Sequence, residues 1–255
     1  MNKVLNTMSR NYKVLLILFC IITILVVAVI YSVSWLRRYQ LFGEYARKID
    51  TDKKAIALTF DDGPNPPITD EILDILAKYR TKATFFVLGK RAEDHIDMLK
   101  KIYAGGHEIG NHSWSHERLQ FRSPAFVKRE VFNTDRIIRA SGYKGPIHFR
   151  SPFGSRFIVL PFLLMRSHRV HILWNITLND WESPTPEKIL QNFEKAMTPG
   201  SIVLLHDGYP KGWENRKNTA KALELILKEY SNKGYQFVTI SELLKMGKPR
   251  AGIVF

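Results

Sequence analysis

Short apolar runs alternate with segments of helical spacing between residues 55 and 245, and this alternation limits the fold more than any other feature of the chain. Residues 55–60 form a compact apolar run, and residues 72–79 repeat apolar side chains at helical spacing. We expect further strands at residues 83–88, 147–149, 170–174, 202–205 and 236–240, and further helices at 91–104, from Ser123 toward Gly142, at 186–197 and at 218–230. The pattern predicts an α/β protein with a largely parallel sheet or barrel.

Four polar clusters each follow one of these apolar runs. They are residues 59–63 (Thr-Phe-Asp-Asp-Gly), 112–116 (His-Ser-Trp-Ser-His), 150–154 (Arg-Ser-Pro-Phe-Gly) and 204–208 (Leu-Leu-His-Asp-Gly). Because the C-terminal ends of parallel strands meet at one edge, we expect the clusters to converge. Carboxylates, imidazoles and an arginine are what a divalent metal with an acid/base pair requires. The clusters together predict one metal-dependent hydrolytic centre.

The first two clusters contain candidate metal ligands. Adjacent side chains at a strand tip point in opposite directions, so Asp61 and Asp62 can serve different partners, one a metal and one a water proton. His112 and His116 are four residues apart, which lets two imidazoles on one face of a helical turn bind the same ion. With one carboxylate they form the open site typical of catalytic zinc or a related divalent ion. A surface Asp-Asp-Gly turn and an ordinary histidine pair are the alternatives.

The other two clusters supply an arginine and a third histidine. Arg150 follows a predicted strand, so its guanidinium could hold a carboxylate while the backbone amides of Phe153 and Gly154 face the site. His206 ends an apolar strand, and that environment suits a proton donor near neutral pH. A surface arginine and a satisfied core histidine are the alternatives.

Residues 14–36 contain no charged side chain. At about 1.5 Å per residue this run can cross a hydrocarbon core roughly 30 Å thick, so we expect one transmembrane helix. A short basic tail (1–13) precedes it, and a basic linker (37–54), the main domain (55–245) and a tail (246–255) follow. A cleaved signal peptide is the alternative, but the run exceeds the usual h-region of about 7–15 residues and no Ala-x-Ala site follows. Cys20, the sole cysteine, lies within the run, which excludes an intrachain disulfide and a thiolate metal site.

The distribution of charge bears on orientation and partners. Lys3, Arg10 and Lys13 precede the apolar run and more basic residues follow it, so a plain positive-inside count favours a cytoplasmic domain. Long folded domains cross largely regardless of charge, and we therefore expect a single-pass protein of the cell membrane with its catalytic domain outside. The net charge of +14 suits an anionic membrane or wall polymer. No nucleic-acid motif is present, so we expect no nucleic-acid partner.

Residues 55–244 resemble the polysaccharide deacetylase family, the NodB-homology domain of carbohydrate esterase family 4. Residues 59–63 match its first motif and residues 112–116 its metal-binding second motif, in the same order and spacing. The resemblance implies a distorted (β/α) barrel and a membrane-anchored bacterial enzyme similar to peptidoglycan N-acetylglucosamine deacetylases. It also implies one divalent metal ion, with zinc as the first choice and cobalt or manganese as alternatives.

The same resemblance assigns a role to each candidate residue. It implies Asp61 as catalytic base, Asp62, His112 and His116 as metal ligands, Arg150 as the residue that holds the base, His206 as catalytic acid, Leu204 and Trp181 as the pocket for the acetyl methyl, and the Phe153 N–H as a donor to the oxyanion. Phe153 replaces a common tyrosine. Thr177 replaces the aspartate that tunes the catalytic histidine in well-known members, and Asp180 could take over that task.

The activity implied is hydrolysis of N-acetyl groups on an amino-sugar polymer, which releases acetate and a free amine. This is a hydrolase reaction on carbon–nitrogen bonds of linear amides other than peptide bonds. Peptidoglycan N-acetylglucosamine is the first substrate expected, with chitooligosaccharides or another envelope glycan as alternatives. An O-acetyl esterase and a glycan-binding protein silenced by Thr177 are the other hypotheses. Trp114, Trp181 and Trp213 are candidate sugar platforms.

Overall fold

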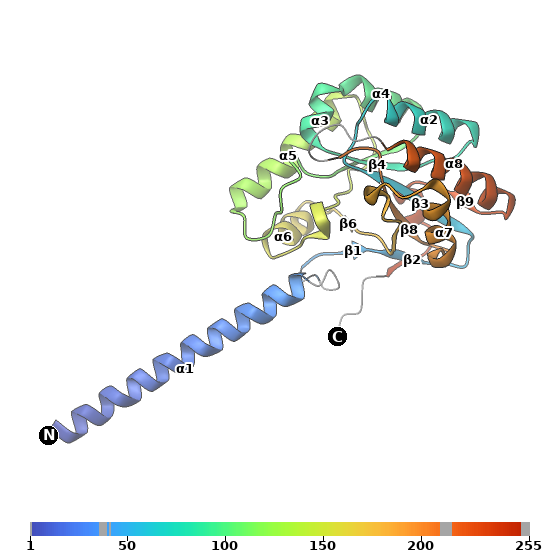
Figure 1. Cartoon of the computed structure of the whole chain (residues 1–255). Coiled ribbons are helices and arrows are strands. Elements are labelled where there is room, and N and C mark those ends of the chain that lie inside the picture. Colours follow the sequence, from blue (N-terminus) through green and yellow to red (C-terminus); the bar gives the residue numbers. More distant parts are fainter. Residues whose placement is uncertain (1, 36–39, 41, 210–215, 251–255) are drawn as a thin grey trace.

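Alternating strands and helices build the domain, as the spacing of apolar residues predicts. The computed structural model describes residues 2–35, 40, 42–209 and 216–250 (Figure 1). The α-helices are α1 (Asn2–Trp35), α2 (Ile68–Lys78), α3 (Gly89–Asp94), α4 (Ile96–Ala104), α5 (Pro124–Ala140), α6 (Val159–Arg166), α7 (Pro186–Ala196), α8 (Lys217–Asn232) and α9 (Ile240–Leu244), with short 3₁₀ helices η1 (Pro152–Gly154) and η2 (Asp180–Glu182). The strands are β1 (Tyr45–Ala46), β2 (Lys48–Asp50), β3 (Ala55–Asp61), β4 (Thr84–Val87), β5 (Glu108–Asn111), β6 (His171–Ile172), β7 (Ile176–Thr177), β8 (Ile202–His206), β9 (Gln236–Phe237) and β10 (Lys248–Arg250).

The main sheet is parallel and curves into a distorted (β/α) barrel, which confirms the predicted fold class. Its strand order is β5-β4-β3-β8-β7, and β9 pairs with the start of β3. Single bridges at Phe149 link β5 to β6, and β6 pairs with β1. An antiparallel bridge pairs Lys48 of β2 with Ser201, the residue that directly precedes β8. This bridge connects the segment after β1 to the other side of the sheet.

The period of two along the central strands decides which residues reach the site. In β3, Ile56, Leu58 and Phe60 belong to the core beneath the helices, whereas Ala55 and Ala57 belong to the second, inner core. Thr59 and Asp61 share the inner face by this alternation. In β8, Ile202 belongs to the inner core, and Leu204 and His206 follow it at intervals of two residues, on the same face. His206 is the register partner of Asp61 on β3.

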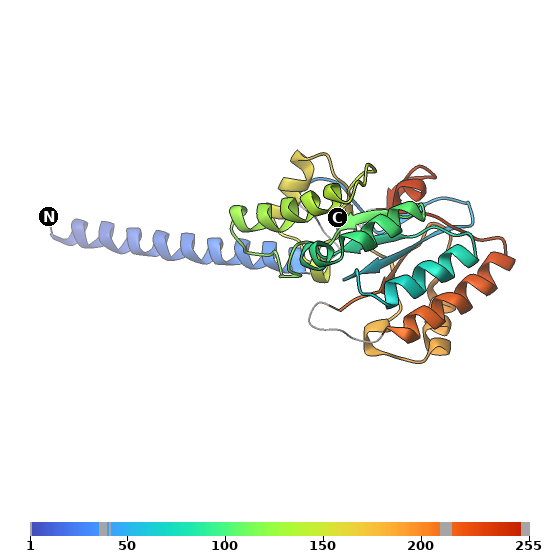
Figure 2. The same ribbon diagram turned by 90° about the horizontal axis from the view of Figure 1, so that it is seen from above.

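Helices cover the outer face of the curved sheet. Along this layer α7 packs on α8, α8 on α2, α2 on α4 and α4 on α5, and Figure 2 shows several of them side by side. Their apolar faces bury the larger core, in which Phe60 and Phe85 stack with ring centroids 5.1 Å apart. This packing fixes the strands whose ends carry the site.

Segments on both sides of the predicted domain, residues 45–50 and 248–250, also form strands. Within the expected linker, residues 45–46 and 48–50 are strands, and Ile49 is buried. The expected C-terminal tail contains β10, which pairs with β2. Gly200 allows β2 to approach closely. Its φ is positive, and a Cβ at this position would overlap the carbonyl oxygen of Ile49, so a larger residue is excluded. Both β2 and β10 contain basic residues and lack an apolar run, so the sequence does not indicate that they pair.

Two predicted elements are broken in the structure. The expected helix 91–104 is two helices, α3 and α4, because His95 has non-helical backbone angles of φ −133° and ψ 45°. The expected strand 147–149 is reduced to single bridges at Phe149. The helix α6 was not predicted.

The helix α1 extends away from the domain (Figure 1). Its residues Tyr12–Ser32 are long and apolar enough to cross a membrane, and they lie outside the domain core. A signal sequence would satisfy the same criteria of length and composition. The predicted N-terminal tail is helical from Asn2, because residues 2–13 contain neither glycine nor proline to stop the helix. The predicted span also includes Leu36, which lies outside the described residues.

Candidate active site

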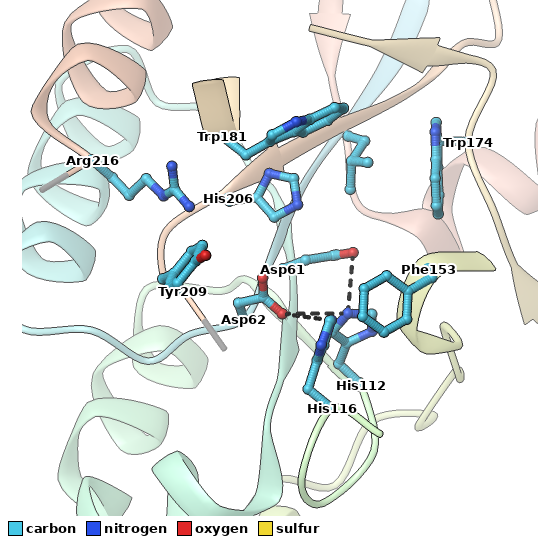
Figure 3. A pocket seen from close by; sticks show the side chains of 11 residues that line it. Asp61, Asp62, His112, His116, Phe153, Trp174, Trp181, His206, Tyr209 and Arg216 are labelled. Carbon is cyan, nitrogen blue, oxygen red and sulfur yellow. Dashed lines mark ion pairs between the residues drawn. The ribbon is translucent and has the colours of Figure 1, made fainter. Parts of the chain in front are cut away.

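A pocket of about 270 Å³ lies at the C-terminal ends of β3 and β8 (Figure 3). Among the predicted site residues, its lining includes Asp61, Asp62, His112, His116, Phe153, Trp181, Leu204 and His206. The two other predicted residues, Arg150 and Asp180, are buried and hydrogen bond to lining residues. The structure therefore brings all the predicted side chains together, although they come from distant parts of the chain.

The two adjacent carboxylates face the same pocket, so the expectation that they point apart is wrong. Asp61 Oδ2 lies 3.6 Å from His112 Nε2, and Asp62 Oδ1 lies 3.5 Å from the same nitrogen. Asp62 follows the last residue of β3 and has a φ of 73°. Its left-handed backbone takes it out of the strand alternation, which places its carboxylate beside that of Asp61.

The histidine pair lies on a loop after β5, so the predicted helical turn is also wrong. Ser113 and His116 have positive φ angles of 73° and 60°, which a continuous right-handed turn does not contain. The backbone N–H of Ser113 donates to Asn111 Oδ1 at 2.8 Å, and the two histidine rings lie 5.1 Å apart between centroids. The loop conformation, rather than a helix face, brings the imidazoles together.

A glutamate from α5 holds this loop. Glu130 Oε2 accepts hydrogen bonds from the backbone N–H groups of Trp114 and Ser115 at 3.0 and 2.9 Å, and Oε1 accepts from Ser115 Oγ at 2.8 Å. Its side chain is buried on the apolar face of α5 with Val127 and Val131. Sequence reasoning missed this residue, although an acid within a buried helical face is a detectable signal.

Asp62, His112 and His116 fit a divalent metal. One potential ligand atom from each residue lies within 4.8 Å of the others. Asp62 Oδ1 is buried and has no hydrogen-bond partner among the described residues. Burial lowers the pKa of both His112 and His116 to about 3, which keeps the imidazoles neutral, as ligation requires.

The surroundings also orient one imidazole toward such an ion. His112 Nδ1 lies 2.8 Å from the carbonyl oxygen of Arg150, to which a neutral ring donates its N–H. This bond leaves the Nε2 lone pair toward Asp62. Burial raises the pKa of Asp62 to about 7, so a bound cation would favour the carboxylate that burial alone disfavours.

Asp61 is held by a buried arginine. Arg150 Nη1 donates to Asp61 Oδ1 at 2.7 Å and to Thr59 Oγ1 at 2.6 Å, while Nη2 donates to the carbonyl of Leu173 at 3.2 Å. Burial raises the pKa of Asp61, whereas the charge and hydrogen bond of Arg150 lower it. The second oxygen of Asp61 remains directed toward His112 (Figure 3).

His206 is paired with Asp180. Its Nδ1 lies 2.9 Å from Asp180 Oδ1, and its backbone N–H donates to Asp180 Oδ2 at 2.8 Å. Burial lowers the pKa of His206, but the charge and hydrogen bond of Asp180 outweigh it, with help from Asp62 and Asp61, and raise this pKa to about 9. The hydroxyl of Thr177 instead accepts from Trp174 Nε1 at 2.7 Å.

The pocket contains further residues that sequence reasoning missed. Trp174, Tyr209 and Arg216 also line it (Figure 3), and Arg216 Nε donates to the carbonyl of Gly208 at 3.0 Å. Tyr209 directly follows the fourth cluster, which was the available signal.

The three candidate sugar platforms have different outcomes. Trp181 lines the pocket and meets the His206 ring edge-on with centroids 5.6 Å apart. Trp114 packs against the larger core, and Trp213 lies outside the described residues.

Comparison with known proteins agrees with this geometry. A family model for polysaccharide deacetylases matches residues 48–158. A chitooligosaccharide deacetylase from Bradyrhizobium sp. is 33% identical over 198 residues, which cover 74% of this chain and 90% of the relative. A peptidoglycan-N-acetylglucosamine deacetylase from Bacillus cereus is 34% identical over 200 residues, which cover 78% of this chain and 92% of the relative.

A solved structure extends the similarity to the fold. The crystal structure of a peptidoglycan N-acetylglucosamine deacetylase matches with a TM-score of 0.75 at 29% identity, and the match covers 85% of this chain and 98% of the other. Identity of this level over nearly the whole length of several relatives, together with the assembled pocket, leads to one conclusion. The chain belongs to the polysaccharide deacetylase family.

Proposed function

We propose that this protein hydrolyses N-acetyl groups on an amino-sugar polymer, with peptidoglycan N-acetylglucosamine as the first substrate. The observation that carries this proposal is the meeting of a three-residue metal site with a separate acid, Asp61, and with the paired histidine His206 at the end of the neighbouring strand. The relatives are deacetylases of peptidoglycan N-acetylglucosamine and of chitooligosaccharides, and both substrates carry the same acetamido sugar.

The protein's own residues supply a base and an acid from the ends of two neighbouring strands, Asp61 on β3 and His206 on β8. Asp61 accepts a proton from the attacking water, and Arg150 fixes its carboxylate in one orientation. His206 is protonated at neutral pH because of Asp180, so it can donate a proton to the departing sugar nitrogen. Water and the amide thereby yield acetate and a free amine.

Asp62, His112 and His116 would hold the metal ion, with zinc as our first choice and cobalt or manganese as alternatives. A bound divalent cation supplies Lewis-acid polarisation of the acetamide carbonyl and lowers the pKa of a coordinated water. The backbone N–H of Phe153 is our candidate donor to the developing oxyanion.

The apolar side of the pocket suits an acetyl methyl group. Leu204 lies on the inner face of β8 one alternation before His206, and Trp181 stands beside the His206 ring. We assign these two side chains to the methyl group. Phe153 contacts the His116 ring with centroids 4.7 Å apart and forms another wall.

Two substitutions separate metal binding from chemistry. His112→Ala should lose bound metal and acetate release together, because it removes a ligand. Asp61→Asn should retain the metal and lose activity by at least about a hundredfold, because it removes the proton acceptor. Acetate release and metal content per protein are measured on the same samples, and an Asp61→Asn protein without metal would contradict this division of roles.

The substrate is tested with defined glycans. Chitooligosaccharides, peptidoglycan fragments and O-acetylated glycans are incubated with the metal-loaded protein, and the mass lost per sugar is recorded. Removal of N-acetyl groups is expected. Release confined to O-acetyl groups would make the protein an esterase, and glycan binding without any release would make it a binding protein.

We also propose that α1 anchors the protein in the cell membrane with the catalytic domain outside. The length and apolar composition of Tyr12–Ser32 support the anchor. The outward orientation is supported by the relatives that act on peptidoglycan, a polymer that lies beyond the membrane.

A further inference from the structure

We propose that the end of the domain beside α1 rests on the membrane and inserts an apolar surface into the interfacial layer of an anionic bilayer. The surface consists of Phe42, Phe121, Ile158, Phe162 and Met165, which we call the α6 surface. The inference goes beyond the proposed hydrolysis, although it depends on the proposed membrane anchor.

The contact between α1 and the domain fixes the depth of this surface. The Tyr31 ring stacks on the Phe121 ring with centroids 5.2 Å apart and planes 18° from parallel. Tyr31 is the second-last residue of the candidate span Tyr12–Ser32, so it would lie in the interfacial layer where tyrosine is enriched. Phe121 must then lie at the same depth.

The rest of the α6 surface lies around the same end of the domain. Figures 1 and 2 both show α6 and the segment leading into α5 at the end of the domain that α1 approaches. Phe121 contacts Phe157 with centroids 4.6 Å apart, and Phe42 meets Phe162 edge-on with centroids 6.4 Å apart. A tilted domain could therefore bring the whole surface to the lipid without a change in its fold.

The composition of α6 is unusual for a helix at an aqueous surface. Leu160 and Leu164 on its inner side are buried in a core with Val127 and Val131 of α5. Its outer side carries Phe162 and Met165, which are 50% and 40% exposed, and Phe121 nearby is 59% exposed. A helix with apolar side chains on both faces usually has both faces buried. The domain buries the inner face of α6, and lipid would bury the outer face.

Basic side chains around this surface favour an anionic bilayer as its partner. Arg122 and Arg129 place their guanidinium groups over the Phe126 ring at 5.0 and 5.7 Å, and Arg166 ends α6. Arg122 also pairs with the exposed Glu117 at 2.9 Å, and Lys128 and Arg129 add positive charge in the first turns of α5. Aromatic side chains flanked by cations suit the headgroup region of an anionic membrane.

The experiment uses the full chain with Cys20→Ser, reconstituted into nanodiscs that contain phosphatidylglycerol. One spin label is attached through Phe162→Cys, and a matched label is attached through Tyr103→Cys on α4, where the native side chain is 38% exposed. Collisions with oxygen, which enters lipid, are compared with collisions with a water-soluble nickel complex. We expect a higher oxygen-to-nickel ratio at position 162 than at position 103, and a smaller difference in phosphatidylcholine.

Two results would overturn the proposal. Equal ratios at positions 162 and 103 in phosphatidylglycerol would show that α6 stays in water. Protection of position 162 from both reagents, with protein–protein cross-links, would show that another protein or a second copy covers the surface. Acetate release from soluble chitooligosaccharides in detergent is measured on the same variants, so loss of membrane contact is distinguishable from a failure of the proposed hydrolysis.

Discussion

At the scale of single residues, His206 is paired with Asp180, which we propose compensates for Thr177. Both oxygens of Asp180 are engaged, one by the His206 ring and one by the His206 backbone and Thr219 Oγ1. Thr177, which stands where an aspartate is usual, instead accepts from Trp174. We infer that Asp180 tunes the charge of His206 and that Thr177 makes only a structural contact.

The replacement Asp180→Asn should move the alkaline limb of the pH–rate profile to lower pH. Asp180 raises the pKa of His206 to about 9, so the ring is protonated below that pH and loses its proton above it. Without the charge of Asp180 the pKa falls toward or below the unperturbed histidine value of about 6.5, and the acid form is lost near neutrality. The measurement is kcat/KM for acetate release from pH 5 to 10.

Thr177→Asp provides the matched control for this profile. Because Asp180 already contacts His206 Nδ1, an added carboxylate at position 177 should move the alkaline limb little. A large gain in rate or an upward movement of the limb would show that Asp180 does not fill the missing role.

At the scale of the elements, α5 determines the shape of the loop that carries the histidines. Glu130 accepts hydrogen bonds from the backbone N–H groups of Trp114 and Ser115 and from the Ser115 hydroxyl. These two residues lie between the candidate ligands His112 and His116 in the sequence. Asn111 reinforces this arrangement, since its Nδ2 donates to Asp135 Oδ1 and its Oδ1 accepts from Ser113. A helix outside the pocket thus positions groups that face into it.

We predict that Glu130→Ala weakens metal binding by about 10–100-fold, as for other residues that orient metal ligands. Glu130→Gln should have an intermediate effect, because its amide oxygen can replace only part of the acceptor set. Zinc affinity is measured by competition with a chelating dye, and the midpoint of thermal unfolding reports any loss of folding. Glu117→Ala is the control, since Glu117 is exposed and pairs with Arg122. Unchanged affinity in a folded Glu130→Ala protein would refute the positioning role.

The sequence predicts the elements better than it predicts their ends. Compact apolar runs correctly indicate the strands that carry Asp61 and His206, because both faces of these strands are buried. The expected side-chain directions fail at Asp62, Ser113 and His116, where positive φ angles interrupt the strand and the expected helical turn, and the side chains follow loop geometry. The sequence also gives no signal for β2 and β10, because their pairing joins residues some 200 positions apart and Ile49 is the buried apolar side chain of β2.

At the scale of the whole molecule, the barrel joins groups that the chain separates widely. The end of β3 supplies both aspartates, the loop after β5 supplies the histidine pair, and the end of β8 supplies His206. Parallel pairing of β3 with both β4 and β8 places these ends at one edge. The proposed membrane contact and the pocket use different side chains, although Phe121 follows the histidine pair on the same loop between β5 and α5.

The orientation of the chain in the membrane gives the last prediction. The greater number of basic residues after the span would favour a cytoplasmic domain, but the long folded domain can cross largely regardless of charge, and its proposed substrate lies outside. In a Cys20→Ser background, a membrane-impermeant maleimide should label Lys144→Cys, an exposed site, in intact cells. Asn6→Cys, before the span, should be labelled only after lysis. The reverse pattern would place the domain in the cytoplasm and remove peptidoglycan as its substrate, while leaving the hydrolytic chemistry of the pocket unaffected.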